Sequence, residues 1–353
     1  MLIGLDATPL LGTRTGIGRY TAGLLGALAT GPDPVVATAF SLRGLSALPG
    51  QVPPGVRVAA RPAPARGLQA LWARSEWPPV ELLTGPLDVF HATNYVLPPL
   101  RRARGVVAIH DLNFLRRPDT VDAASARFRA LVPRSIRRAG AITVLTTTMA
   151  DQVRDEYRPA VPVVVTSVGV DQAWFEAIPP SPGLRVDLGL PASYVLFVGT
   201  LEPRKDLPTL LAAHSLLPDA PPLVLVGPPG WGDRVDVTGC VTPGFLPDAV
   251  LHSVVAGAAA LVVPSLDEGF GIPVVEALAA GTPVVASDLA VLREVGGPHV
   301  TYAEVGHPES FATALSAVLA DPGPAGPRRE WAATFTWDRC AQACLSAYRQ
   351  ALS

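Results

Sequence analysis

Short apolar runs rich in β-branched residues alternate with helix-length segments along the whole chain, and this alternation limits the fold more than any other feature. Leu2–Leu5 is followed by the helical pattern of Gly18–Ala29, and Tyr194–Val198 by that of Leu207–Leu216. Runs that are apolar throughout indicate strands of a parallel sheet that helices bury on both faces. The pattern therefore predicts an α/β protein with doubly wound parallel sheets.

The predicted strands are spread over both halves of the chain, with room for a covering helix between most of them. In the first half they are Leu2–Leu5, Val35–Phe40, Val56–Ala59, Val89–His91, Val106–Ile109, Ala141–Leu145 and Val163–Ser167. In the second half they are Tyr194–Val198, Leu223–Val226, Val237–Thr238, Ala260–Val263 and Pro283–Ala286. The length of 353 residues suits two such domains.

Charge separates the same two halves. Residues 1–171 carry 19 arginines and 12 acidic residues, a net charge of +7, whereas residues 172–353 carry 9 basic and 18 acidic residues, a net charge of −9. The Pro-rich stretch 178–183 lies where the balance changes sign and is the predicted linker region. We therefore predict one domain over residues 1–171, a second over 172–335 and a C-terminal helix over 336–353.

Total charge, cysteines and hydropathy argue against several classes of protein. The net charge of −2 is unsuited to a nucleic-acid binder, which neutralises phosphates with many cations. Cys240, Cys340 and Cys344 form neither a C-x-x-C pair nor a cluster with His, so no zinc site or disulfide framework is predicted. The chain opens directly on a predicted strand, and the uncharged stretch 249–266 suits a helix followed by a strand better than a membrane span. We expect a cytoplasmic protein.

One motif combines two glutamates with a glycine-rich loop. Glu268 and Glu276 are separated by seven residues, and Gly269-Phe270-Gly271 follows the first of them. Loop glycines let backbone N–H groups approach a ligand closely, and the start of the next helix favours an anion or hydroxyl-rich group. Glu276 lies among apolar neighbours, so it is expected to have a partner such as a pair of ribose hydroxyls. The alternative is a solvated helix residue.

Together with Phe197-Val198-Gly199-Thr200-Leu201-Glu202-Pro203-Arg204-Lys205, this motif closely resembles the retaining, nucleotide-sugar-dependent glycosyltransferases of family 4. Three further segments, 15–20, 109–112 and 167–171, resemble that family's glycine loop, central His motif and approach to the linker. The resemblance implies the GT-B architecture, with two Rossmann-like domains facing across a cleft. It also implies that the first domain serves the acceptor, the second binds the nucleotide sugar, and the C-terminal helix crosses back to the first.

Arg204 and Lys205 are the predicted diphosphate clamp. A guanidinium offers a bidentate fork and an ammonium a compact charge, and cations at the start of a helix are unfavourable unless an anion joins them. Lys205 is also the only lysine of the chain. The alternative is a solvated pair of cations. Many relatives have Arg at the position of Thr200, so the clamp is expected to rely more heavily on Arg204 and Lys205.

The resemblance assigns roles to the remaining site residues. His110 lies against the donor sugar, and Glu268 with the backbone of Gly269 and Phe270 grips its hydroxyls. Glu276 holds the ribose. The other donor contacts fall on Gly16, Ile17, Gly227, Phe245, Leu246 and Gly271. The alternative for each of these residues is a purely structural role, at the start of an ordinary helix, as a buried histidine or in a turn.

The predicted reaction is transfer of a sugar from a nucleoside diphosphate to a hydroxyl of a glycan or lipid-linked acceptor, with retention of configuration. The favoured donor is GDP-mannose; a UDP-sugar transferase, a nucleotide-sugar epimerase and a non-catalytic sugar-binding protein are the alternatives. No D-x-D motif occurs, so neither a metal nor a cofactor is expected, and no protein nucleophile is assigned. These activities belong to polysaccharide or glycolipid synthesis.

The stretch Arg101–Arg138 holds 10 arginines and three acidic residues. Arg127, Arg134 and Arg138 share a helical face by their spacing, which suits an anionic lipid surface or a lipid-diphosphate-linked acceptor. A peripheral location on the inner face of the membrane would follow. The alternative is a solvated arginine surface in a chain that has almost no lysine.

Overall fold

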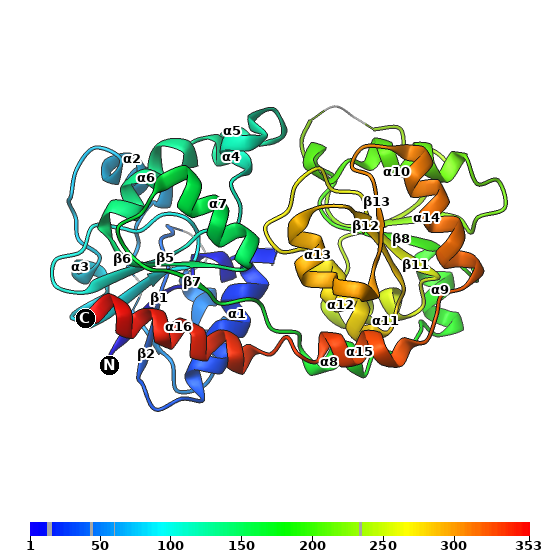
Figure 1. Ribbon diagram of the computed structural model, residues 1–353. Coiled ribbons are helices and arrows are strands. Elements are labelled where there is room, and N and C mark those ends of the chain that lie inside the picture. Colours follow the sequence, from blue (N-terminus) through cyan, green and yellow to red (C-terminus); the bar gives the residue numbers. More distant parts are fainter. Residues whose placement is uncertain (13–15, 43–44, 60, 233–234) are drawn as a thin grey trace. The chain divides into compact units, whose positions relative to one another are not determined.

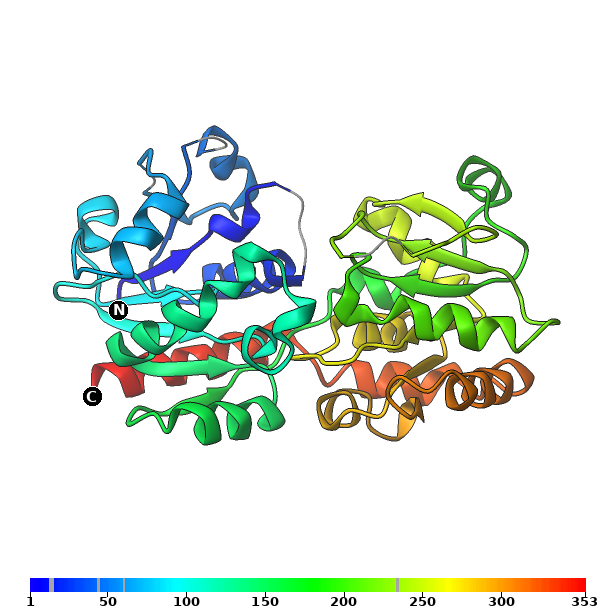
Figure 2. The same ribbon diagram turned by 90° about the horizontal axis from the view of Figure 1, so that it is seen from above.

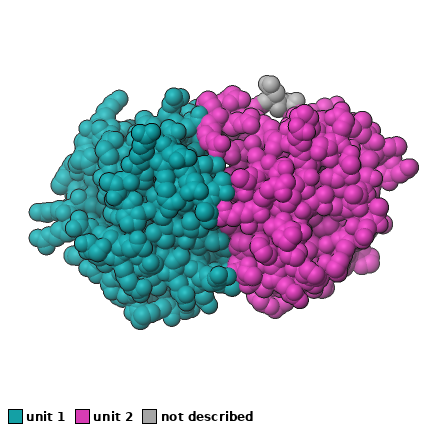
Figure 3. All heavy atoms as spheres, viewed as in Figure 1, with its two compact units in different colours: residues 1–115, 123–169, 336–353 teal, residues 116–122, 170–335 magenta. Residues whose placement is uncertain are grey.

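The computed structural model describes residues 1–12, 16–42, 45–59, 61–232 and 235–353 (Figure 1). They form two compact units (Figure 3). Unit 1 consists of Met1–Leu115, Ala123–Gly169 and Thr336–Ser353, and unit 2 of Arg116–Asp122 and Val170–Phe335. Each unit is built around a parallel sheet of its own.

The division differs from the prediction in two places. The chain leaves unit 1 after Gly169, and the short segment Arg116–Asp122 belongs to unit 2. The Pro-rich stretch 178–183 is not the linker, because it begins helix α9 (Pro182–Leu188) inside unit 2. Ser181 caps that helix by accepting a hydrogen bond from the backbone N–H of Leu184 at 3.3 Å. A proline suits the first helical position because its missing N–H is not needed there.

The sheet of unit 1 has seven strands in the order β3-β2-β1-β4-β5-β6-β7. Its central strands are buried and apolar, as expected for a sheet covered on both faces. The order reverses between β1 and β4, because the chain adds β2 and β3 on one side of β1 and then continues with β4 on the other. The strands are β1 (Ile3–Asp6), β2 (Val35–Thr38), β3 (Arg57–Val58), β4 (Val89–Ala92), β5 (Arg104–Ala108), β6 (Ala139–Val144) and β7 (Val163–Val165).

The C-terminal helix α16 (Trp337–Leu352) lies along the sheet of unit 1, beside β6 and α1 (red in Figure 2). The Tyr348 hydroxyl lies 2.8 Å from Nδ1 of His91, and both side chains are fully buried. The other helices of this unit are α1 (Gly16–Ala29), α2 (Ala65–Trp72), α3 (Glu81–Thr84), α4 (Asn113–Arg116), α5 (Ala123–Ala126), α6 (Phe128–Arg138) and α7 (Thr147–Tyr157), of which α4 ends at the first residue of unit 2. Short 3-10 turns occupy Thr8–Leu10 and Leu45–Gln51.

The sheet of unit 2 has six strands in the order β10-β9-β8-β11-β12-β13. Its order reverses between β8 and β11, in the same way as that of unit 1 between β1 and β4. The strands are β8 (Val195–Val198), β9 (Leu223–Val226), β10 (Val241–Gly244), β11 (Ala260–Val263), β12 (Val284–Ser287) and β13 (Thr301–Ala303). The expected strand at 237–238 corresponds to β10, which begins four residues later, and β13 was not expected. Both are edge strands with little apolar sequence.

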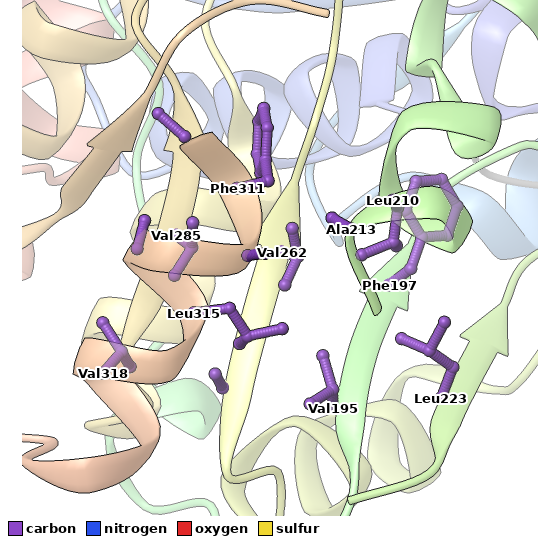
Figure 4. Packing of buried hydrophobic residues seen from close by; sticks show 14 of the residues in the cluster. Val195, Phe197, Leu210, Ala213, Leu223, Val262, Val285, Phe311, Leu315 and Val318 are labelled. Atoms are coloured by element: carbon purple, nitrogen blue, oxygen red, sulfur yellow. The ribbon is translucent and has the colours of Figure 1, made fainter. Parts of the chain in front are cut away.

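Alternate side chains of the unit 2 sheet form one core with two helices (Figure 4). Val195, Phe197 and Val262 point from the strands toward Leu210 of α10 and Leu315 of α14. Because side chains alternate across a strand, the residues between them face the opposite side, where α12 packs. The helices are α8 (Gln172–Phe175), α10 (Leu207–Ser215), α11 (Asp248–Ala256), α12 (Ile272–Ala280), α13 (Ala290–Gly296), α14 (Pro308–Ala320) and α15 (Ala325–Ala332).

The uncharged stretch 249–266 folds as expected into most of α11 followed by β11. Among the described residues, no helix is long and apolar enough to cross a membrane.

Candidate active site

The predicted clamp residues lie at the point where the strand order of unit 2 reverses. Pro203–Lys205 form a 3-10 turn after β8, and the loop that carries Glu268 follows β11. In open α/β sheets, ligands bind beyond the carboxyl ends of strands at such a switch point. The backbone N–H of Leu266 donates to the carbonyl oxygen of Arg204 at 2.8 Å and fixes the two loops against each other.

Glu268 is the centre of this arrangement. Its Oε1 accepts hydrogen bonds from Lys205 Nζ at 2.6 Å and from the Ser265 hydroxyl at 2.8 Å, and its Oε2 accepts one from Arg204 at 3.0 Å. Burial alone would raise the pKa of this carboxyl, but the charges of Lys205 and Arg204 outweigh it and lower the pKa to about 2. Glu268 is therefore ionised throughout the neutral range.

Arg204 bridges two carboxylates. Its Nη2 donates to Glu202 Oε1 at 2.6 Å, while its Nη1 donates to Glu268 and to the carbonyl oxygen of Asp267 at 3.0 Å. Glu202 is 8% exposed and Glu268 is 6% exposed, so the guanidinium is held by two buried anions. Two cations and two carboxylates thus form one network after β8 and β11.

Sequence reasoning placed Arg204, Lys205 and Glu268 in the site and missed Glu202 and Ser265. The structure brings the three predicted residues together, although 63 residues separate Lys205 from Glu268. Both oxygens of Glu268 bind the clamp, so its role as a grip on sugar hydroxyls stays a prediction. The sequence feature that could have indicated Glu202 is its position two residues before Arg204, which is close enough for the two side chains to pair.

The clamp cations reach solvent at this switch point. The Lys205 side chain is 13% exposed and that of Arg204 is 17% exposed, whereas the glutamates beneath them are buried more deeply. An ammonium carries three N–H donors, and among the described residues Lys205 uses one of them, on Glu268. Lys205 therefore retains donors for an anion.

Gly227 is required by the close approach of two loops. A Cβ atom at this position would lie 2.0 Å from the carbonyl oxygen of Gly199, and one at Gly230 would lie 2.2 Å from that of Leu201. The loop after β9 therefore packs directly on the backbone that leads from β8 to the clamp. This packing accounts for the glycine at 227 independently of any ligand.

The remaining predicted residues of unit 2 differ in exposure. Leu246 is buried in the protein, so its side chain is a core residue and only its backbone is suited to a ligand, whereas Phe245 is 49% exposed. Gly271 caps α12 with a φ of +90°, a backbone conformation that favours glycine.

The glycine motif places both of its glutamates below the surface. Phe270 is buried and its ring packs edge-on against Phe335, with ring centroids 5.9 Å apart. Glu276 is buried in the second turn of α12, so it is not the solvated helix residue of the alternative reading. Gly269 links Glu268 to this hydrophobic contact.

In unit 1, His110 follows β5 and is held in one orientation. Its Nε2 lies 2.7 Å from the carbonyl oxygen of Thr93, and the Tyr20 and Tyr95 rings pack edge-on against it at 5.1 and 5.6 Å. Because a carbonyl oxygen only accepts, Nε2 carries the hydrogen. Burial lowers the pKa of His110, so the ring is neutral and Nδ1 is a hydrogen-bond acceptor.

The predicted glycine loop is described only from Gly16 onward, and Thr15 lies outside the described residues. Gly16 and Ile17 open α1, with Gly16 exposed. The first backbone N–H groups of a helix have no partner within it, so this end is suited to the predicted donor contacts.

Two arginines of the predicted face are already engaged in contacts within the protein. Arg138 donates to Glu76 at 2.6 Å and to the carbonyl oxygens of Trp72 and Leu97, and Arg134 lies 3.6 Å from the same carboxylate. These two arginines therefore have structural contacts that the sequence, with Glu76 about sixty residues away, did not indicate. The arginines of this stretch that are exposed in unit 1 are Arg101, Arg102, Arg104, Arg129 and Arg137.

Known proteins resemble the chain over both units. Residues 15–169 match the family described as "Glycosyl transferase 4-like domain", and residues 192–321 match "Glycosyl transferases group 1". The O-antigen chain mannosyltransferase B of Escherichia coli is 28% identical over 285 residues, or 74% of each chain. The D-inositol 3-phosphate glycosyltransferase of Mycolicibacterium vanbaalenii is 31% identical over 304 residues, which span 77% of this chain and 66% of that protein, slightly less than two thirds of its length.

Solved structures share the fold. Sucrose-phosphate synthase from Thermosynechococcus elongatus superposes with a TM-score of 0.76 and 21% identity, covering 99% of this chain and 98% of that one. Anabaena HepE in complex with UDP and glucose superposes with a TM-score of 0.71 and 17% identity, covering 98% of each chain.

Proposed function

The chain belongs to the group 1, family 4-like glycosyltransferases of GT-B fold, and on that premise we propose that it moves a sugar from a nucleoside diphosphate to an acceptor hydroxyl with retention of configuration. The observation that carries this proposal is the network of Arg204, Lys205, Glu202 and Glu268 at the carboxyl ends of β8 and β11. Cations held in place before the donor arrives stabilise the charge that develops on the departing diphosphate.

Each residue then has one task. Lys205 and Arg204 bind the diphosphate, Glu268 holds both of them in position, and Glu276 receives the ribose. His110, neutral with its Nδ1 as acceptor, is the residue of unit 1 proposed to bind a hydroxyl of the donor sugar. The proposal needs no metal and no cofactor, because the two cations supply the positive charge that the leaving group requires.

The donor we favour is GDP-mannose, with UDP-glucose as the second candidate. The mannosyltransferase relative from Escherichia coli supports the first, and the Anabaena structure that holds UDP and glucose supports the second. The acceptor is proposed to be a glycan or a lipid-linked sugar in polysaccharide or glycolipid synthesis. Specificity between such donors rests on a few pocket groups, so the donor has to be measured.

A peripheral association with an anionic membrane is a separate part of the proposal. It rests on the exposed residues Arg101, Arg102 and Arg104, which lie just before β5 and at its first position. It does not rest on Arg134 and Arg138, because these pair with Glu76. Sedimentation with vesicles of acidic and of neutral lipid at low salt tests it. Equal retention by both kinds of vesicle would remove this part of the proposal.

The only lysine of the chain gives the clamp a direct test. Lys205 carries the only side-chain amino group of the chain, and an amine-reactive reagent such as trinitrobenzenesulfonate modifies it alongside the α-amino group of Met1. We expect a saturating nucleoside diphosphate to slow modification of Lys205 at least tenfold and to leave that of Met1 unchanged, as read by mass spectrometry. Comparing GDP, UDP and ADP identifies the donor nucleotide. Modification of Lys205 at the same rate with and without each of these nucleotides and inorganic pyrophosphate would overturn the clamp.

A further inference from the structure

None of the tasks proposed for the clamp involves Ser265, although this residue contacts its centre. Ser265 lies shortly after β11 and is fully buried, and its hydroxyl donates to Glu268 Oε1 at 2.8 Å. The same oxygen accepts from Lys205 Nζ at 2.6 Å. Within the described ranges, Oε1 is therefore held by one neutral donor from its own loop and by one charged donor from the loop that follows β8.

The two cations of the clamp differ in how firmly they are held. The Arg204 guanidinium donates to Glu202, to Glu268 and to the carbonyl oxygen of Asp267. The Lys205 ammonium has one hydrogen-bond partner among the described residues, Glu268, and its four-carbon stem is flexible. Lys205 is therefore the cation that can reorient when an anion binds.

A bound diphosphate competes with Glu268 for Lys205. It carries more negative charge than a single carboxylate and therefore attracts the ammonium more strongly. The N–H donors that Lys205 does not use on Glu268 let it contact the diphosphate before it leaves the carboxylate. Glu268 is 6% exposed, and a buried carboxylate needs hydrogen-bond donors to replace any that it loses. The hydroxyls of a donor sugar are such donors.

We propose that Ser265 is a positioning residue for an exchange of partners on Glu268. The diphosphate draws Lys205 away from Oε1, Ser265 keeps the carboxylate in place, and a hydroxyl of the donor sugar replaces the ammonium. The exchange is complete before the reaction begins. It also favours product release, because a nucleotide without its sugar leaves Oε1 short of a donor and Lys205 returns to it. The inference rests on the proposed function and deepens it, since it states how one site distinguishes the donor from the product nucleotide.

Ser265→Ala tests the inference, because it removes the hydroxyl and little else. Titration calorimetry without an acceptor measures Kd for GDP and GDP-mannose and for UDP and UDP-glucose. The quantity compared is the sugar ratio, which is the Kd of a nucleotide divided by that of its nucleotide sugar. For the pair that binds the wild type, we expect the variant to lower the sugar ratio at least fivefold and to leave the Kd of the nucleotide within twofold. A smaller change in the sugar ratio would overturn the role of Ser265.

Ser287→Ala is the matched control. Ser287 ends β12, the strand beside β11, and is as deeply buried as Ser265. Its hydroxyl has no hydrogen-bond partner among the described residues, so the substitution removes the same atom without breaking a hydrogen bond. We expect the sugar ratio of this variant to equal that of the wild type. An equal fall in both serine variants would show a general effect of packing and would contradict the inference.

Two glutamate variants test the exchange itself. Glu268→Gln and Glu202→Gln each remove one negative charge from the clamp, so both should tighten binding of the nucleotide. Only Glu268→Gln should also lower the sugar ratio, because Glu202 takes no part in the exchange. An equal sugar ratio in the two variants would refute the exchange, even if Ser265→Ala failed to fold. So would an unchanged Kd of the nucleotide in Glu268→Gln, since Glu268 would then not compete for Lys205.

A double variant distinguishes positioning from a merely structural role. If Ser265 acts through the carboxylate, adding Ser265→Ala to Glu268→Gln should leave the sugar ratio where Glu268→Gln alone places it. Additive effects would mean that Ser265 acts independently of Glu268 and would overturn the inference. If the nucleotides bind and every variant has the wild-type sugar ratio, the exchange is refuted and the proposed function stands. If neither the nucleotides nor their sugars bind the wild type, the proposed function fails, and the inference fails with it.

Discussion

The Lys205 ammonium lies 2.6 Å from the Oε1 atom of Glu268, and this contact joins the loops that follow β8 and β11. Together with Arg204 and Glu202, these side chains carry two positive and two negative charges, so the network is neutral without a ligand. A diphosphate therefore meets cations that are already oriented. Fixed charges need no reorganisation during the reaction, which is the property expected of groups that stabilise a leaving group.

Lys205→Ala should impair catalysis far more than stability. It removes a charge that acts on the departing diphosphate, so we expect kcat/KM for transfer to fall at least tenfold, or about 1.4 kcal/mol. Steady-state kinetics with circular dichroism of the folded protein checks this. Arg293→Ala is the control, because Arg293 forms an exposed ion pair with Asp288 in the same unit. A loss of less than threefold in Lys205→Ala would contradict the clamp.

Glu202→Gln should have opposite effects on binding of the diphosphate and on catalysis, because Glu202 both adds negative charge to the clamp and positions Arg204. The substitution keeps the shape of the side chain and removes a negative charge that binds Arg204 at 2.6 Å. We expect the nucleoside diphosphate to bind more tightly, because the clamp gains net positive charge, and kcat to fall severalfold, because Arg204 is held less precisely. Titration calorimetry and kinetics measure the two effects. Weaker binding of the diphosphate would contradict this account.

Acidic pH should lower the stability of unit 2, because it protonates Glu268. Its pKa is about 2 in the folded protein against an ordinary 4.5, so the folded state binds its proton more weakly than the unfolded state. The stability that this carboxylate contributes is then complete above pH 4.5 and is lost as the pH falls toward 2, by about 3 kcal/mol in all. Glu268→Gln should be least stable relative to the wild type at pH 7, and the difference should vanish near pH 2.

Calorimetric unfolding of the full chain between pH 7 and pH 2 measures this difference. Glu330→Gln, which changes an exposed glutamate of α15 in the same unit, should follow the wild type at every pH. A difference in stability between Glu268→Gln and the wild type that does not change with pH would show that the ion pairs of Glu268 do not lower its pKa.

The sequence predicted the central strands well because they are buried on both faces and are therefore apolar throughout. The edge strand β13 was missed and β10 was predicted too early in the chain, since a strand such as Val241–Gly244 is partly exposed and contains Pro243. Contacts between residues far apart in the sequence could not be predicted either. Nothing in the local sequence pairs Arg138 with Glu76, and only the fold reveals that Ser265 hydrogen-bonds Glu268.

Asp6→Asn should stabilise the protein at neutral pH. Burial raises the pKa of Asp6 to about 6 from an ordinary 3.8, although hydrogen bonds from Thr8 lower it in part. The folded state binds this proton more tightly than the unfolded state, so stability falls as the pH rises from 3.8 through 6. The variant should exceed the wild type by up to about 3 kcal/mol at pH 7.5 and lose its advantage near pH 4.

Urea unfolding at several pH values checks this expectation, and Asp155→Asn on the exposed side of α7 should have no such effect. A gain of stability on removal of a buried charge is typical of residues kept for function. An advantage of Asp6→Asn that persists at pH 4 would contradict the raised pKa.

Two glycines of α1 differ in what an added methyl group would meet, and they test how α16 is held on unit 1. A Cβ atom at Gly23 would lie 2.1 Å from the Trp337 ring, whereas one at Gly26 would meet nothing within 4 Å. Gly23→Ala should therefore push Trp337 and the start of α16 away and lower stability by about 1–3 kcal/mol. Gly26→Ala should raise stability by about 0.5–1 kcal/mol, because alanine favours the helix. Thermal unfolding compares the two, and hydrogen exchange of α16 locates the change. Equal stability of both variants would mean that Trp337 does not anchor α16 at this position.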